Sequence, residues 1–500
     1  MFRGQIVNAK LCATVVGETT EELRARRDAA DGADMVELRL DYAKSVDVAG
    51  VLADRRVPVV VTCRPKWEGG EFNGSEEERR VLLTQAFELG AEYVDVEWTA
   101  GFNDLISADR GRRIVLSVHD FTGHLRDLDG QLRAMRSTGA EVTKVAVTTR
   151  CLTDLVRLRE FGRRNADNGR QIVIGMGAAG VTSRVLPDLF DSSWTYAGDG
   201  VAPGQLSLGQ MRDEYRIRSL GEGSELFGVL GKPLEHSLSP VMHNAGFRAI
   251  QRDAVYLPFE AADIEDFERF AIEFNVAGAS VTAPYKTVAL AKSTRVDELS
   301  RRVGAVNTLM KKDGAWHARN TDVPGFLEPL RGRMKLEQCR ATVLGAGGAA
   351  RGVVTALIDE GAKVTVCARV AEHAKSVAQL CGAETADMPP VAGTWDLLVN
   401  TTPVGTYPDS DESLVDPNDI KGQLVYDLVY NPPVTRLLAD ASAAGCSTIG
   451  GLAMLVAQAE RQFEWWTGQS APADGFRCAA EARLESMGRA DKLDEMEAEK

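Results

Sequence analysis

The sequence predicts an α/β protein with three parts: a (β/α)8 TIM barrel, a smaller α/β domain and a Rossmann domain. Two observations lead to this prediction. The first 220 residues repeat a short β-branched run followed by a charged stretch of helical composition. In the second half of the chain, a strand-like run is followed by the glycine-rich turn 345–348 and then by a helical stretch. Strands that alternate with helices pair in parallel, so both regions are expected to be α/β.

Eight runs predict the barrel strands, and eight strand–helix units fit a closed barrel of this length. An open doubly wound sheet is the alternative, and the count favours the barrel. The predicted strands are Ile6–Val16, Met35–Leu40, Val57–Cys63, Tyr93–Trp98, Ile114–Val118, Val142–Val147, Ile172–Met176 and Trp194–Ala197. The helical segments between them include Glu21–Gly32, Ser75–Gly90, Leu128–Gly139 and Leu152–Gly169.

The turn-rich stretch Gly221–Ser224 is the predicted boundary after the barrel. A new strand pattern begins at Leu226–Leu230, and a further α/β unit begins at Cys339. We therefore expect the barrel at 1–220, the smaller α/β domain at 225–335 and the Rossmann domain at 336–450. Helices at 451–500 are expected to pack back on the smaller domain and to end in a charged tail from about Gly488.

Composition and charge exclude several classes of protein. The 500 residues include 58 basic and 72 acidic side chains, a net charge of 58 − 72 = −14. This balance argues against a general nucleic-acid or anionic-membrane binder, which needs clustered Lys and Arg. No apolar run approaches the ~18 residues of a membrane helix. The 8 cysteines are scattered without a C-x-x-C pair, and no secretory signal is seen at the start, so we expect reduced thiols in the cytoplasm.

Polar residues near the carboxyl ends of barrel strands are the candidates for chemistry. Glu37 and Arg39 alternate on one strand, so both are expected to face the lumen. Lys144 interrupts an apolar run, and His119 ends the fifth run. Burial favours the neutral amine of a lysine, which can attack a ketone to form a Schiff base, and a nearby histidine could transfer a proton. A snorkelling lysine and a structural histidine are the alternatives.

Six motifs occur in order along the first half: Glu37–Asp41, Thr62–Gly70, Ser117–Phe121, Lys144–Ala146, Thr182–Arg184 and Ala202–Gln205. Together they resemble type I 3-dehydroquinate dehydratase over about residues 1–215. The resemblance implies that Lys144 forms an imine with the 3-keto group of 3-dehydroquinate. It also implies that His119 removes the neighbouring proton and later protonates the departing hydroxyl, which yields 3-dehydroshikimate.

The same resemblance assigns the other barrel residues. Glu68 orients the histidine, and Arg184 binds the substrate carboxylate through its planar guanidinium. Val201 stands where the family usually has a serine, so a hydroxyl donor to the substrate is lost. No metal ion is required. The remaining substrate contacts implied are Glu37, Arg39, Arg64 and Gln205.

The second half contains a dinucleotide-type turn. The strand Ala341–Leu344 leads into Gly345–Gly352, which reads G-x-G-x-x-A and would let a pyrophosphate approach a helix N-terminus. Arg369 follows the next strand, where an arginine suits a 2′-phosphate, so NADP is favoured over NAD. Glu372 is the alternative, as a contact to a ribose diol. The turn residues expected to bind the cofactor are Gly345, Ala346, Gly347, Gly348 and Ala349.

Further motifs in the second half are Gly231–Pro240, Ser280–Lys286, Gly304–Thr308, Asn320–Asp322, Asn400–Pro403, Tyr426–Tyr430 and Gly450–Gln458. Singly, they read equally well as helix starts, turns or an exposed lysine. Together they resemble shikimate dehydrogenase over about residues 226–480. The resemblance implies that Lys286 donates a proton to the reduced carbonyl and that Asp322 binds the neighbouring hydroxyl.

The resemblance also assigns Asn400 and Thr401 to the cofactor, and Ser237 and Ser239 to the substrate carboxylate. His373 stands where members with strong NADP preference often carry a second basic residue, so that preference is expected to be modest. The other substrate contacts implied are Thr282, Asn307, Tyr430 and Gln458.

The two resemblances are complementary, because the first half would make the ketone that the second half reduces with NADPH. We therefore expect a bifunctional enzyme of the shikimate pathway, which leads to chorismate and the aromatic amino acids. It would act on small molecules (3-dehydroquinate, 3-dehydroshikimate and shikimate) and bind neither nucleic acid nor membrane. A quinate-type dehydrogenase, a chain with one non-catalytic half and a class I aldolase barrel are the alternatives. The sequence does not decide between a monomer and a homodimer.

Overall fold

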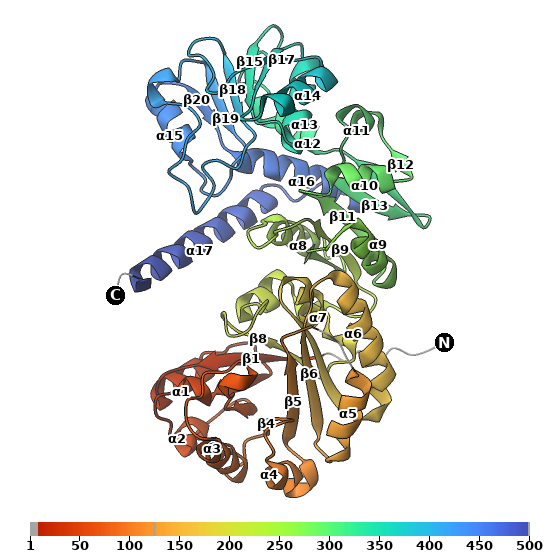
Figure 1. Cartoon of the computed structure of the whole chain (residues 1–500), viewed down its shortest axis with the longest axis vertical. Helices are drawn as coiled ribbons and strands as arrows, with labels where there is room; N and C mark the ends of the chain where they lie inside the picture. The colour runs from red at the N-terminus through yellow and green to blue at the C-terminus, as the bar shows by residue number, and fades with distance from the viewer. Residues whose placement is uncertain (1–8, 124–126, 499–500) are drawn as a thin grey trace. The chain divides into compact units, whose positions relative to one another are not determined.

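The computed structural model describes residues 9–123 and 127–498, apart from the side chains of 489–498 (Figure 1). The chain forms two compact units, 1–226 with 253–275 and 227–252 with 276–500. Within the described residues, no helix combines the length and the apolar character needed to cross a membrane. Residues 6–8 of the predicted first strand lie outside the described residues, and the predicted charged tail falls mostly on side chains that are not described.

The first unit contains the predicted barrel. Its eight strands follow the order β7-β6-β5-β4-β3-β2-β1-β8, and every ladder is parallel. Each predicted run overlaps one strand, so the fold prediction is confirmed for this half. The strands are β1 (Lys10–Val16), β2 (Met35–Arg39), β3 (Val59–Thr62), β4 (Tyr93–Glu97), β5 (Ile114–Asp120), β6 (Val142–Thr148), β7 (Arg170–Met176) and β8 (Trp194–Ala197).

Helices surround the strands and begin where the sequence carries caps. Ser75 and Glu78 form a reciprocal capping box at the start of α3, and Asp47 caps α2. The helices of this unit are α1 (Thr20–Asp28), α2 (Val48–Leu52), α3 (Glu76–Glu88), α4 (Asn103–Ser107), α5 (Leu128–Ser137), α6 (Leu152–Asn165) and α7 (Val181–Val185), with β10 (Ala254–Phe259) and α9 (Ile264–Glu273) from the later segment.

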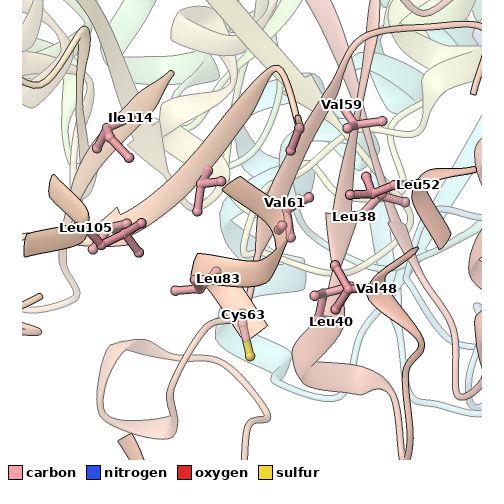
Figure 2. Close-up of a cluster of buried hydrophobic side chains, with 14 of the residues drawn as sticks. Leu38, Leu40, Val48, Leu52, Val59, Val61, Cys63, Leu83, Leu105 and Ile114 are labelled. Atoms are coloured by element: carbon pink, nitrogen blue, oxygen red, sulfur yellow. The ribbon is translucent and has the colours of Figure 1, made fainter. Parts of the chain in front are cut away.

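Alternation along the strands separates two apolar clusters. Leu38 of β2 and Val61 of β3 pack outward against α2, α3 and α4, as Figure 2 shows. Met35 and Val60 belong instead to the cluster at the amino end of the lumen. Because Glu37 and Arg39 share the parity of Met35, they face the lumen above that apolar floor. Apolar side chains thus fill the amino end of the lumen, and polar side chains lie at its carboxyl end.

The barrel closes at a seam between β7 and β8, where the described residues form no strand ladder. The Ser193 N–H donates to Gln171 O at 2.8 Å. The Ser192 hydroxyl accepts from the Val173 N–H at 2.9 Å and donates to Val173 O at 3.2 Å. A buried side chain therefore satisfies the backbone groups that a ladder would otherwise pair.

The second unit carries the predicted Rossmann sheet. Its six strands are parallel and follow the order β17-β16-β15-β18-β19-β20, which is the classic 3-2-1-4-5-6 arrangement. The strands are β15 (Arg340–Leu344), β16 (Lys363–Cys367), β17 (Glu384–Ala386), β18 (Leu397–Asn400), β19 (Leu424–Asp427) and β20 (Ser447–Ile449). The helices beside them are α13 (Gly348–Asp359), α14 (Ala371–Cys381) and α15 (Arg436–Ala443).

A further six-stranded sheet has the order β10-β9-β11-β13-β14-β12. Helix α16 reaches it through Trp466, whose indole N–H donates to Leu309 O at 2.9 Å. The remaining strands are β9 (Glu225–Leu230), β11 (Val276–Val281), β12 (Arg295–Val296), β13 (Thr308–Lys312) and β14 (Ala315–Arg319). The remaining helices are α8 (Ser239–Ala249), α10 (Lys286–Lys292), α11 (Glu298–Val303), α12 (Asp322–Leu327), α16 (Gly451–Thr467) and α17 (Gly475–Ala498).

The seam makes a stability prediction. Ser192→Ala removes the hydroxyl that satisfies Val173, so the barrel should lose about 1–3 kcal/mol of unfolding free energy. Hydrogen exchange of barrel peptides measures this loss. Ser193→Ala is the control, because the described bonds of Ser193 use its backbone. Equal protection in the two variants would contradict a role for the Ser192 side chain.

Candidate active sites

One cavity at the carboxyl end of the barrel brings together the predicted barrel residues. Val201, which replaces the serine usual in the family, also lines this cavity. The predicted residues that line this cavity are Glu37, Arg39, Arg64, Glu68, His119, Lys144, Arg184 and Gln205. Residues from six different strands or the loops after them therefore converge, as expected for a barrel of this class.

Lys144 lies on β6 inside the lumen and is 5% exposed. Its Nζ donates to Asp95 Oδ2 at 3.0 Å and lies 3.8 Å from Glu37 Oε1. The ring of Tyr196 stands 4.3 Å from the same nitrogen, measured to the ring centroid. The lysine is therefore buried and charge-compensated rather than snorkelling, and two carboxylates and an aromatic ring hold the amine in one place.

Arg64 supports this arrangement from β3's carboxyl end. It donates to Asp95 at 3.0 Å, to Glu97 at 2.7 Å and to Ser117 at 2.9 Å. Burial alone would raise the pKa of Asp95, but Arg64 and Lys144 outweigh it and hold that pKa well below its usual range. Burial would likewise lower the pKa of Arg64, and Asp95 and Glu97 reverse this.

Sequence analysis missed Asp95 and Ser117 as site residues. Asp95 shares the parity of Glu97 on β4, and Ser117 faces Lys144 in the β5–β6 register. Strict two-residue alternation could have placed Asp95 in the lumen. Ser117 shares the parity of His119 on β5, so the same alternation could have placed it in the lumen; it donates to Asp95 on the neighbouring strand at 2.6 Å.

His119 is held by Glu68. A Glu68 carboxylate oxygen accepts the His119 backbone N–H at 2.9 Å and lies 3.4 Å from His119 Nδ1. Burial, with help from Arg64 and Lys144, lowers the pKa of His119 well below its ordinary value. Burial raises the pKa of Glu68 to about 7. The imidazole is therefore neutral at neutral pH and able to accept a proton.

Three other predicted residues differ in how free they are. Arg184 is 2% exposed, its Nε has no partner among the described residues, and burial lowers its pKa to about 10. The Gln205 Oε1 is also buried without a described partner. Arg39, by contrast, already binds Asp41 through two bonds of 2.9 and 2.7 Å. Arg184 and Gln205 therefore offer polar atoms to a ligand, and Arg39 offers less.

A second cavity lies in the second unit, with Lys286 and Asp322 at its centre. Lys286 begins α10 and Asp322 begins α12, and Lys286 Nζ donates to Asp322 Oδ2 at 2.6 Å. Asn307 donates to the other oxygen of Asp322 at 2.8 Å and to Gln458 Oε1 at 3.2 Å. The carboxylate is thus fixed from two sides, and the ammonium points into the cavity.

The other predicted substrate residues of this half line the same cavity: Ser237, Ser239, Thr282 and Tyr430. Burial raises the pKa of Tyr430, so its phenol is protonated. Gln462 was missed by the sequence analysis. It accepts from Ser280 at 2.7 Å and donates to Asn307 O at 3.1 Å, which joins β11 to the residue just before β13.

The glycine-rich turn fits a dinucleotide. Gly345 has φ +111°, and a Cβ there would lie 2.6 Å from Thr401 Oγ1. The N-cap of α13 is Gly347, with no side-chain cap, so the first N–H groups of that helix face outward for a phosphate. Ala349 lines the second cavity, and a Cβ on Gly348 would lie 4.0 Å from Lys286 Cδ. The turn therefore opens beside Lys286.

Asn400 and Thr401 hold this turn rather than point freely away from it. Asn400 is 1% exposed and donates to Asp427 at 2.9 Å, and Thr401 donates to Leu344 O at 2.7 Å. Arg369 follows β16 and is exposed. Across residues 9–123 and 127–498, no group of three or more His, Cys, Asp or Glu side chains is arranged to hold a metal ion.

Two separate cavities, one in a lysine-bearing barrel and one beside a Rossmann turn, define a two-site enzyme. Family comparisons match type I 3-dehydroquinase at 11–222 and the shikimate dehydrogenase substrate binding domain at 229–309. They also match shikimate / quinate 5-dehydrogenase at 330–416 and the shikimate 5'-dehydrogenase C-terminal domain at 451–481.

A bifunctional 3-dehydroquinate dehydratase/shikimate dehydrogenase of Arabidopsis thaliana is 32% identical over 501 residues, covering 92% of this chain and 82% of that protein. The chain belongs to this bifunctional family. An NADP(+) shikimate dehydrogenase of Methanocella arvoryzae is 40% identical over 52% of this chain and 99% of its own. A crystal structure of shikimate dehydrogenase with NADP+ matches at TM-score 0.50 and 30% identity, over 53% of this chain and 97% of that one.

The Glu68 environment makes a pH-dependent prediction. The folded pKa of about 7 lies above the ordinary value of 4.5, so the folded barrel retains a proton between these values that the unfolded chain has released. Stability therefore falls as pH rises through this window. Glu68→Gln removes that loss, so the barrel should gain about 1–3 kcal/mol at pH 8 and little at pH 4.5.

Hydrogen exchange of the β5 and β6 peptides at the two pH values measures this gain. Glu71→Gln is the control, because its side chain is exposed. A gain of the same size at both pH values, or a loss at pH 8, would show that the Glu68 carboxylate is not destabilised by burial.

Proposed function

We propose that the chain dehydrates 3-dehydroquinate in the barrel and reduces the product, 3-dehydroshikimate, to shikimate at the second site. The observation that carries this proposal is the buried Lys144, held 3.0 Å from Asp95 in the same cavity as a neutral His119. Family membership supports both steps. The consecutive order of the two reactions matches the order of the two units along the chain.

In the barrel, Lys144 gives up one proton and its amine attacks the 3-keto carbon; that proton goes to the former keto oxygen, which leaves as water as the iminium forms. The iminium acidifies the neighbouring C–H, and His119 takes that proton through its neutral imidazole. His119 then returns the proton to the departing hydroxyl, which leaves as water. Hydrolysis of the iminium consumes one water and restores Lys144, so the net change is loss of one water molecule.

Eight side chains that line the barrel cavity are available for substrate binding and catalysis, and two of them, Arg184 and Gln205, have a polar atom without a described partner. Arg184 is the proposed partner of the carboxylate, because a guanidinium with a buried, unpaired N–H favours a planar anion. Gln205, Glu37, Arg39 and Arg64 are the proposed hydroxyl and carbonyl contacts, and Glu68 orients His119. Val201 lines the cavity without a hydroxyl, so its side chain contributes only apolar contact.

At the second site, Lys286 donates a proton to the carbonyl oxygen as that carbon is reduced. Asp322 accepts a hydrogen bond from the neighbouring hydroxyl, and Asn307 keeps its carboxylate in place. NADPH supplies the hydride when bound. Ser237 and Ser239 are the proposed carboxylate contacts, with Thr282, Asn307, Tyr430 and Gln458 around the ring.

The proposed cofactor contacts are the turn residues 345–349 and Arg369, with Asn400 and Thr401 shaping the turn. An exposed guanidinium after β16 suits the 2′-phosphate of NADP. The crystal structure of shikimate dehydrogenase with NADP+ described above supports this choice. We retain 1–220, 225–335, 336–450 and 451–500 as the proposed functional divisions of the chain.

We propose the cytoplasm as the compartment, because all eight cysteines are free thiols. The name of the Arabidopsis relative places that protein in the chloroplast. The proposed partners are the small molecules of the two reactions.

Trapping tests the barrel assignment directly. Borohydride added with 3-dehydroquinate should reduce the iminium and leave a covalent adduct on Lys144, found by peptide mass spectrometry. Lys144→Met should abolish both the adduct and dehydration, while reduction of 3-dehydroshikimate continues. An adduct on a different lysine would remove the role of Lys144.

Lys286→Ala tests the second site in the opposite sense. Loss of the proton donor should lower the rate of NADPH oxidation with 3-dehydroshikimate by about 10²–10⁴-fold. Dehydration of 3-dehydroquinate, followed by the absorbance of the enone product, should be unchanged. If both activities fell together in a folded protein, the two sites would not be independent.

A further inference from the structure

Arg79 lies outside the barrel cavity, yet it is 0% exposed on α3, directly after the exposed acidic first turn of that helix. Its neighbour Arg80 shows the ordinary arrangement: a partly exposed guanidinium that pairs with Asp104 and Glu77. Burying a guanidinium is costly unless its donors are paired with carboxylates or carbonyls. The complete burial of the Arg79 guanidinium therefore requires a set of buried partners.

The partners of Arg79 account for most of its donors. It donates to Glu76 at 3.1 and 2.6 Å and to Cys63 O at 3.2 Å. It also forms a short ion pair with Glu97, a carboxylate that is 0% exposed. The Phe102 ring lies 4.7 Å from its guanidinium carbon. A buried cation is thus packed between an aromatic ring and a buried anion.

Glu97 connects Arg79 to the cavity. One carboxylate oxygen of Glu97 binds Arg79, and the other accepts from Arg64 at 2.7 Å. Arg64 passes the contact to Asp95 at 3.0 Å, and Asp95 binds Lys144 at 3.0 Å. The result is a line of five side chains with alternating charge that runs from α3 to the reactive amine.

We infer that Arg79 is a positioning residue for the dehydration step, acting through Glu97 and Arg64 on the Asp95–Lys144 pair. This inference rests on the proposed function of the barrel. Since Glu97 divides its two oxygens between two arginines, Arg79 keeps one oxygen from Arg64. Arg64 is then left to bridge Glu97 and Asp95 rather than bind one carboxylate through both of its terminal nitrogens.

Loss of Arg79 frees the second oxygen of Glu97. A bidentate Arg64–Glu97 pair becomes available, because a guanidinium prefers that fork-to-fork geometry. Asp95 then loses Arg64 and retains Lys144 as its cation. With Arg64 withdrawn, Asp95 is held by Lys144 and Ser117 alone, so the lysine amine is displaced from the position in which it attacks the ketone.

Arg79→Met in the full chain tests the inference, with Arg80→Met as the matched control on the same helix. We expect Arg79→Met to lower kcat for dehydration and the rate of borohydride trapping at Lys144 by about a hundredfold, the scale of a small misplacement of reacting groups. The KM for 3-dehydroquinate should change little, because Arg79 does not line the cavity. Arg80→Met should behave as wild type, and Arg79→Lys should restore part of the rate.

The coupling to Glu97 is tested with Glu97→Gln. If Arg79 acts through Glu97, Arg79→Met should add little to the loss already caused by Glu97→Gln, so the double variant should be less impaired than the product of the single effects. Fully multiplicative losses would overturn the proposed route. Shikimate dehydrogenase activity of the same chain reports whether the variants affect the second unit.

Other outcomes separate a structural role from the one inferred. A wild-type kcat for dehydration in folded Arg79→Met, or a loss carried by KM alone, would overturn the inference. So would a loss that equals the loss of folded barrel, measured by hydrogen exchange of β4–β6, with the remaining folded protein fully active. Absence of any Lys144 adduct in the wild type would overturn the proposed function, and the inference with it, whereas a normal adduct in both proteins overturns the inference alone.

Discussion

The ion pair between Lys144 and Asp95 is the constraint on which the barrel depends. Both side chains lie in the lumen, and neither charge is stable there alone. Asp95 keeps its charge because Arg64 and Lys144 outweigh its burial. Ser117 and Glu97 then hold Arg64, so the position of the Lys144 amine depends on side chains on β4 and β5 and on the loop after β3. The apolar floor of the lumen below them excludes water from this network.

Both sites contain a lysine–aspartate pair, but the two lysines differ in their exposure to solvent. Each places a lysine against an aspartate whose other oxygen accepts from a neutral donor, Ser117 in the barrel and Asn307 in the second unit, and in the barrel Arg64 binds that oxygen too. Lys144 is enclosed by strands, whereas the Lys286 side chain is 20% exposed at the start of a helix. Enclosure suits a nucleophile that must stay in one position, and a more open ammonium suits a donor that exchanges protons with solvent after each turnover.

Much of the fold followed from local pattern. The eight barrel strands and the Rossmann turn were predicted because alternation, β-branched runs and glycine spacing are properties of short segments. Asp95 was missed although its parity on β4 would have placed it in the lumen. Ser117 shares the parity of His119 on β5 and could have been placed in the lumen in the same way. Gln462 could not be found this way, because its partners lie on β11 and just before β13. The pairing of Arg39 with Asp41 also required the structure, since adjacent charges in a sequence do not show which of them meet.

The sequence alone determined the order of the parts, the strand and helix types, the family resemblance and the residues that carry reactive groups. Only the tertiary structure decided how those groups are charged and which are free. The pKa of His119 is low because the imidazole is buried near Arg64 and Lys144. The pKa of Glu68 is about 7 because its carboxyl group is buried. Arg79 became relevant only through Glu97. Electrostatic interaction depends on distance and burial, and both arise when distant segments pack together.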